Sequence, residues 1–165
     1  MSGTAHSFDT TAGASSEVTA VVPCDPREIA AAIEAVRNAA RPVVHICLSA
    51  RDVSEPGVRT RVCKNVRETV SMVRAAGIPV QFSIAHIEEM ERPFRRQCIG
   101  VAVEAGATRI AVPGSAAEMV CDIAGFVGPR VAVSTFSEAP CECVSATAAN
   151  PATHDWRCRV EVAAL

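Results

Sequence analysis

Short apolar runs alternate along the chain with longer segments in which apolar residues recur every three or four positions. The short runs are typical of buried strands, and the longer segments of helices with one buried face. The predicted strands are residues 18–22, 42–48, 79–83, 108–112, 131–135 and 159–162. The predicted helices are residues 26–39, 60–76, 93–105, 115–126 and 141–149. Helices therefore separate the strands along most of the chain.

Turn residues mark the ends of several predicted helices. Asp25 and Pro26 provide an N-cap and a first-turn proline for the first helix, while Gly77 and Gly106 follow the second and third. Strands that are apolar throughout and joined by helices indicate a parallel sheet covered by helices, because parallel strands need long crossover connections. The pattern predicts an α/β protein, either a barrel or an open sheet.

The length and composition fit one such domain. Apolar residues make up 49% of the 165 residues and aromatic residues only 4%, which suits small-residue helices packed on β-branched strands. Residues 1–17 are rich in Gly, Ala, Ser and Thr, so we expect a loop-rich N-terminal arm that holds one short strand near Asp9. Residues 18–165 then form a barrel-like domain.

Charge and hydropathy exclude some classes of partner. The formal net charge is -2, with acids and bases interleaved, so the sequence predicts no binding of nucleic acid or of an anionic membrane. No apolar run approaches the roughly 20 residues of a membrane span, and residues 1–17 lack the pattern of a signal peptide. We therefore expect a cytoplasmic protein.

The chain has eight cysteines, most of which lie in apolar segments and predict buried free thiols. Examples are Cys47, Cys98, Cys121 and Cys158. Cys141 and Cys143 form one C-x-C pair that could bind a soft metal, but a single pair of this kind is a weak signal.

Six segments carry a resemblance to a known family: residues 8–11 (FDTT), 43–49 (VVHICLS), 80–83 (VQFS), 104–113 (EAGATRIAVP), 131–138 (VAVSTFSE) and 159–162 (RVEV). They resemble, in order, the strand motifs of the DRE-TIM metallolyases, which include isopropylmalate synthase and homocitrate synthase. The family motifs are F-D-T-T-L-R-D-G-E-Q, R-x-H-T-F-I-A-T-S, V-E-F-S, E-A-G-A-T-x-I-N-I-P, V-S-V-H-C-H-N-D and Q-V-E-C. The resemblance implies a (β/α) barrel.

The resemblance also implies that the barrel is incomplete. Between Thr11 and Val18 there is no room for the family's first helix, second strand and second helix, so about seven parallel strands remain. A missing strand leaves backbone groups unpaired beside residues 18–22. We expect a homo-oligomer that covers this gap, unless residues 13–16 let the flanking strands pair directly in a smaller barrel.

The family's metal chemistry is not retained in the sequence. Members hold a divalent cation with the first-strand Asp, here Asp9, and with two His whose positions are Ser134 and Phe136. The family's Arg and Glu fall at Gly13 and Ser16. We therefore expect no bound metal and no cofactor, with acyl-CoA as a possible substrate.

Parts of an α-keto acid pocket do match the family pattern. The resemblance implies substrate contacts for His45, Ser83 and Ser115, with Asp9 and Glu138 at the same mouth.

We assign catalytic roles to His45 and His86, the latter as a general base, although a neutral core His at position 45 and a solvated loop His at position 86 explain the sequence too. Three arginines could bind the phosphate of coenzyme A or form a solvated helix face: Arg92, Arg95 and Arg96.

Two functions remain open. One is an enzyme that carries out an aldol-type condensation or a lyase step on an α-keto acid or acyl-CoA without metal. The other is a non-catalytic subunit that pairs with itself or with a complete synthase.

Overall fold

The computed structural model of the protein describes residues 17–53, 56–114, 117–136 and 159–163. Its strands are β1 (Glu17–Pro23), β2 (Pro42–Ser49), β3 (Val80–Ala85), β4 (Arg109–Pro113), β5 (Ala132–Phe136) and β6 (Arg159–Ala163). Its helices are α1 (Pro26–Val36), α2 (Arg59–Ala75), α3 (Arg92–Glu104) and α4 (Ala117–Val127). Three short 3₁₀ helices, which the sequence pattern does not reveal, are η1 (Ala50–Val53), η2 (Pro56–Val58) and η3 (Ile87–Glu89).

The predicted strands and the first four predicted helices are confirmed, each within a few residues of its expected ends. The Asp25 side chain caps α1 by accepting a hydrogen bond from the backbone N–H of Arg27 at 3.0 Å. Gly106 follows α3 with a φ of 112°, and a Cβ there would lie 3.0 Å from Cγ of Arg74. The predicted helix at 141–149 and the predicted strand near Asp9 lie outside the described residues.

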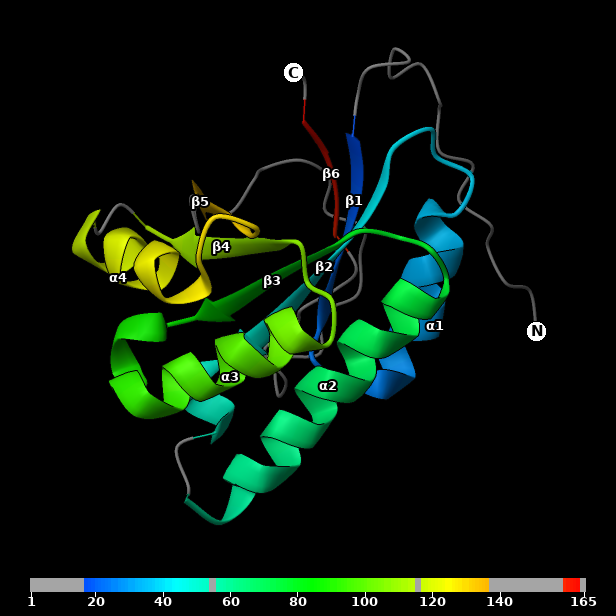
Figure 1. Ribbon diagram of the computed structural model, residues 1–165. Helices are drawn as coiled ribbons and strands as arrows, with labels where there is room; N and C mark the ends of the chain where they lie inside the picture. Colours follow the sequence, from blue (N-terminus) through cyan, green and yellow to red (C-terminus); the bar gives the residue numbers. More distant parts are fainter. Residues whose placement is uncertain (1–16, 54–55, 115–116, 137–158, 164–165) are drawn as a thin grey trace.

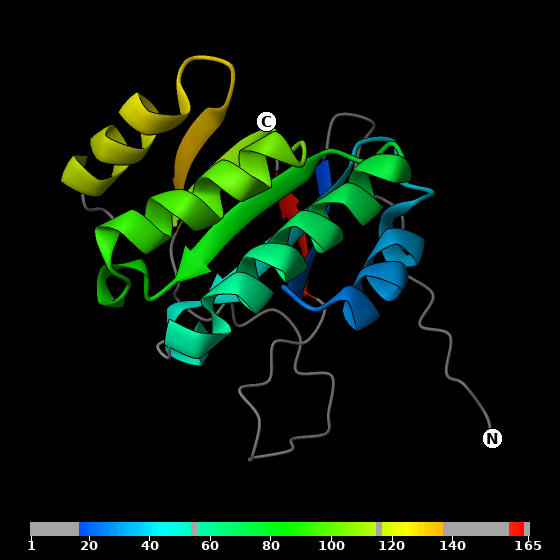
Figure 2. The ribbon, with the colours of Figure 1, turned by 60° about the horizontal axis from the view of Figure 1, so that its bottom comes forward.

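The strands form one sheet in the order β5-β4-β3-β2-β1-β6 (Figure 1). Strands β1 to β5 are parallel and follow the chain order, so each crossover turns the same way and places its helix on the same face. Figure 2 shows α1, α2 and α3 together in front of the sheet. We call the opposite side, which none of the described helices covers, the helix-free face. The α/β prediction is confirmed.

The last strand differs from the prediction. β6 pairs with β1 antiparallel, with Val160 opposite Ala20, so the prediction of a further parallel strand at 159–162 is wrong. The alternation of Val160, Glu161 and Val162 predicts a strand but carries no information about its direction. The described residues form an open sheet and do not show the predicted barrel of about seven parallel strands.

Antiparallel pairing also changes the expected exposed edge. The backbone groups of β1 are paired on one side with β2 and on the other with β6, so the predicted gap beside residues 18–22 is closed within the chain. The two edge strands of the described sheet are then β5 and β6. None of the described helices is long and apolar enough to cross a membrane.

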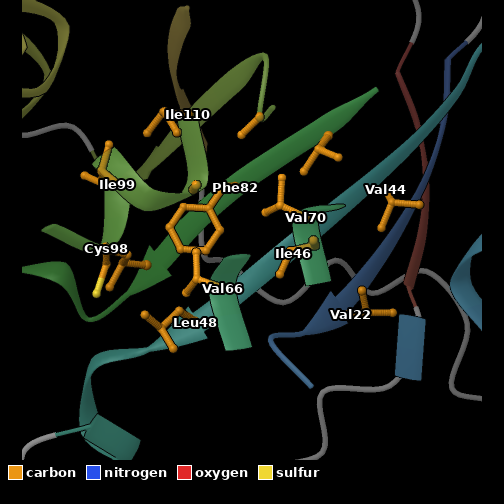
Figure 3. Packing of buried hydrophobic residues seen from close by; sticks show 14 of the residues in the cluster. Val22, Val44, Ile46, Leu48, Val66, Val70, Phe82, Cys98, Ile99 and Ile110 are labelled. Atoms are coloured by element: carbon orange, nitrogen blue, oxygen red, sulfur yellow. The ribbon is translucent and has the colours of Figure 1, made fainter. Parts of the chain in front are cut away.

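The main core lies between the sheet and its helices (Figure 3). Phe82 of β3 is fully buried in this core, where it lies near Val66 and Val70 of α2 and Ile99 of α3. Every second residue of the strands joins the core because strand side chains point alternately to the two faces. The residues between them, among them His45 and Ser83, therefore face the helix-free side.

An ion pair crosses the helix-free face from β1 to β4. The Arg109 guanidinium contacts the Glu17 carboxylate at 2.6 and 2.8 Å. In a flat sheet these strands lie three spacings of about 4.8 Å apart. The residue of β1 in line with Arg109 is Val21, four positions beyond Glu17. The contact therefore requires the sheet to coil toward this side, which makes the helix-free face concave.

We predict that Glu17→Gln lowers the free energy of unfolding by about 1 kcal/mol at pH 7, a value reduced by solvent screening at the one-third-exposed Arg109 side chain. The hydrogen bond from Arg109 lowers the pKa of Glu17 from its ordinary value of 4.5. This stabilisation is therefore complete above the unfolded-state pKa and is lost as pH falls through the lowered folded-state pKa.

Urea unfolding of both proteins over a pH series measures the difference. The control is Glu34→Gln, which breaks the exposed Glu34–Arg37 pair of α1 and should change stability by no more than about 0.5 kcal/mol. An equal effect of the two substitutions, or a Glu17 effect that does not change with pH, would contradict the role of the pair.

Candidate functional site

His45 lies in the middle of β2 on the helix-free face, with only 4% of its surface exposed. Its neighbours in the strand, Val44 and Ile46, point into the helix-covered core. In the sheet ladder His45 stands opposite Gln81 of β3, and Cys47 stands opposite Ser83. Two adjacent parallel strands thus place an imidazole, an amide and a hydroxyl together.

These three side chains form one hydrogen-bonded group. Nε2 of His45 lies 2.7 Å from Oγ of Ser83, and the Gln81 side-chain nitrogen lies 3.3 Å from Nδ1 of His45. Ser83 is 1% exposed and Gln81 is half-buried. The structure therefore brings together two of the predicted site residues, His45 and Ser83, and adds Gln81, which the sequence analysis did not single out. The sequence feature that could have pointed to Gln81 is its position: it is a polar residue within an apolar strand, two positions before Ser83, and so lies on the same face of the strand.

Burial decides the charge of the imidazole. Removal from water disfavours the charged form and lowers the pKa of His45 to about 4. At neutral pH the ring is therefore uncharged, with one nitrogen donating and the other accepting a hydrogen bond. A general base works best when its pKa lies near the working pH, so this environment suits ligand binding better than proton transfer.

The second predicted catalytic residue lies elsewhere. His86 follows β3 directly, with a left-handed backbone (φ 53°), and stands five residues beyond Gln81. Five residues of strand span about 16 Å. The structure therefore does not bring His86 to His45.

His86 has its own neighbours. Its ring and the carboxylates of Glu88 and Glu89 offer ligand atoms within 4.8 Å of one another, an arrangement that could hold a cation. Glu89, however, already accepts hydrogen bonds from Arg51 at 2.8 and 3.2 Å. Because both carboxylates are also exposed, this group is an ordinary solvated cluster on the surface.

The remaining predicted substrate contacts cannot be placed. Asp9, Ser115 and Glu138 lie outside the described residues, as do Cys141 and Cys143. Ser134, which stands at one of the family's His positions, is exposed on β5.

A cavity of about 280 Å³ opens at the carboxyl ends of β1 and β2, where parallel α/β folds commonly bind ligands. We call it the rim cavity. Polar groups from three separate segments line it, namely Asp25, Ser49, Arg61 and Asn65, together with apolar residues and two cysteines. Neither His45 nor Ser83 lines this cavity. The sequence analysis missed it because its walls come from the end of β1, the end of β2 and the start of α2.

The arginines of α3 have a role that the sequence did not reveal. Arg92, Arg95 and Arg96 all contact the carboxylate of Asp122 in α4. The hydrogen bonds from Arg92 and Arg96 hold the pKa of Asp122 well below its usual range. The solvated-face interpretation is thus wrong for Arg95, which is 8% exposed and joins α3 to α4.

The thiol prediction is confirmed in part. Cys47, Cys63 and Cys98 are free and buried, whereas Cys121 is free but exposed on α4. Burial raises the pKa of the Cys24 thiol to about 11. Cys158 lies outside the described residues. High thiol pKa values oppose nucleophilic roles, because the thiolate is the reactive form.

Known proteins share part of this sequence. The 2-isopropylmalate synthases of Staphylococcus aureus strains JH9, Newman and JH1 are each 33% identical to the chain over 94 residues. The match covers 54% of this chain and 18% of each relative, so the chain spans about a fifth of the length of the relatives that it matches. No protein-family model matches the chain. The identity supports a distant relationship to the 2-isopropylmalate synthase family.

Proposed function

We propose that this chain is an isopropylmalate synthase-like protein that binds a small α-keto acid at the His45–Ser83 pair without a divalent metal. The observation that carries the proposal is the 2.7 Å contact between these two side chains, which lie buried side by side on the concave helix-free face. Both were expected to contact substrate from the resemblance alone.

The chemistry of the pair suits this ligand class. An α-keto acid presents only oxygen acceptors, and the Ser83 hydroxyl, whose oxygen contacts Nε2 of His45, supplies an O–H donor. Donors held in a buried site bind oxygens more strongly than the same donors in water, because competing solvent is absent. The coiling that Arg109 and Glu17 impose gives the pair a concave setting.

The residues at the family's metal positions do not fit a divalent cation. Such ions take carboxylate or imidazole ligands, but a hydroxyl stands at Ser134 and an apolar ring at Phe136. Asp9 would then be the only ligand left of the family's set. The proposal therefore includes neither a metal nor another cofactor.

Only binding is proposed because, among the described residues, the imidazole that contacts Ser83 is the neutral His45. An aldol-type condensation or a lyase step needs a group that moves protons, and His86 is about 16 Å along β3 from the position opposite His45 and about 10 Å from Ser83. Acyl-CoA gains no support from the α3 arginines, since all three contact Asp122.

We predict that the wild-type protein binds 2-oxobutyrate in buffer that contains EDTA. We also predict that His45→Ala and Ser83→Ala each weaken this binding by about 1–3 kcal/mol, because Ser83→Ala removes the donor to the ligand and His45→Ala removes the group that holds that donor in place. Isothermal titration calorimetry with 2-oxobutyrate and, separately, acetyl-CoA gives the affinities. The matched control is Thr19→Val. Thr19 is a buried polar residue of β1 that lies on the helix-free face, as His45 does.

Unchanged affinity in His45→Ala would remove that residue from the site. Binding that disappears in EDTA and returns with Mg²⁺ would contradict the metal-free proposal. A wild-type protein that binds none of a panel of 2-oxo acids would refute the keto acid function.

A second candidate function is that of a non-catalytic subunit that self-associates, and the α4–β5 edge favours it. Only Ile123 of α4 is buried, while Phe126 is 42% exposed on a helix rich in apolar residues. β5 beside it ends the described sheet and pairs only with β4 among the described strands. An open strand edge next to apolar surface favours pairing with another chain. We propose that a homodimer forms at this edge.

We predict that sedimentation equilibrium at micromolar concentration gives twice the chain mass of 17.3 kDa. Phe126→Asp should shift the equilibrium toward the monomer, because it places a charge in the apolar contact. Ala31→Asp, on the exposed side of α1, should leave the mass unchanged. A wild-type mass near 17 kDa would rule out this dimer, and a dimer unaffected by Phe126→Asp would place the interface elsewhere.

A further inference from the structure

Gln81 occupies the position of β3 that faces His45 across the sheet ladder. In the strand motif that residues 80–83 resemble, V-E-F-S, this position holds Glu. The two side chains have similar shapes but different hydrogen-bonding abilities. An ionised carboxylate only accepts hydrogen bonds, whereas the amide nitrogen of glutamine only donates them.

We propose that Gln81 is a positioning residue: its amide donates to Nδ1 of His45, fixes the Nε2–H tautomer and so directs the hydroxyl proton of Ser83 toward the ligand. The ligand class that follows is a molecule that offers a hydrogen-bond acceptor to Ser83, such as a carboxylate or carbonyl oxygen. The ligand part of this inference rests on the function proposed above, but the tautomer does not.

The hydrogen-bond partners of the ring determine which nitrogen carries the proton. The Gln81 side-chain nitrogen lies 3.3 Å from Nδ1, and since that nitrogen carries only protons, Nδ1 must be the acceptor. A neutral imidazole then holds its single proton on Nε2. That proton points at Oγ of Ser83, 2.7 Å away, so the serine oxygen accepts. The hydroxyl proton remains available for another acceptor.

A carboxylate at position 81 would reverse each step. It would accept a hydrogen bond from Nδ1–H, and Nε2 would accept a hydrogen bond from the hydroxyl of Ser83. The serine would then offer only lone pairs, and the site would favour ligands that donate. Residue 81 therefore sets the hydrogen-bond polarity of Ser83 without touching the ligand.

Burial supports this arrangement because it keeps the ring neutral. With the pKa of His45 lowered to about 4 by burial, the doubly protonated ring, which would remove the distinction between the two tautomers, is a minor species at pH 7.

The test is ¹⁵N NMR of the ligand-free protein with labelled histidine at pH 7, because the two ring nitrogens have well-separated shifts when only one carries a proton. The chain has four histidines, so the signals lost in His45→Ala assign the ring. We expect a protonated Nε2 and an unprotonated Nδ1 in the wild type. Gln81→Glu should reverse this pattern, and Gln81→Leu, which has no donor, should give a mixture. Thr19→Val is the control and should keep the wild-type pattern.

The second measurement is the affinity for 2-oxobutyrate, which we expect to fall about tenfold or more in Gln81→Glu and to stay unchanged in Thr19→Val. A wild-type ring protonated on Nδ1 would overturn the proposal, as would a Gln81→Glu protein that keeps the Nε2–H tautomer. If the tautomers are as expected but the wild type binds no 2-oxo acid, the role of Gln81 stands and the proposed function fails.

Discussion

The right-handed crossover between parallel strands is the constraint on which this structure depends. Strand twist makes each strand–helix–strand connection turn the same way. Since β1 to β5 lie in chain order, α1 to α4 all fall on one side of the sheet. The core then forms on that side alone, around Phe82 and its neighbours. None of the described helices covers the other face, so its side chains must find partners within the sheet or from the rest of the chain.

Polar groups on that face pair across the strands. Arg109 reaches Glu17 over two intervening strands, and His45 contacts both Ser83 and Gln81. Buried polar groups are tolerated when their hydrogen bonds are made, because an unmade bond costs the full loss of hydration. The ion pair and the His45 group are thus consequences of the same topology. The first is possible only because the sheet is coiled, and the second places polar groups on the concave face.

Periodicity predicted the strands and helices because each depends on local pattern and on turn residues such as Asp25 and Gly106. Features that depend on segments far apart in the sequence were not predictable in this way. The direction of β6 depends on where the chain returns to the sheet, and the partner of Arg95 depends on how α4 packs on α3. His45 and Ser83 were found through the family resemblance, whereas Gln81 was missed because it departs from the motif. Its importance follows only from the ladder that places it opposite His45.

The environment of His45 also favours ligand binding over catalysis among the candidate functions. A reaction on an α-keto acid requires both a place for the oxygens and a group that takes or gives a proton. The Ser83 hydroxyl beside the buried imidazole fits the first, but burial lowers the pKa of that imidazole to about 4 and removes the second. Moving His86 into reach would require a displacement along β3 of about five residues, which would turn every side chain of the strand to the opposite face. The described site therefore fits the proposed recognition of a small acceptor-bearing ligand better than catalysis, which would need a proton-transfer group from outside β2 and β3.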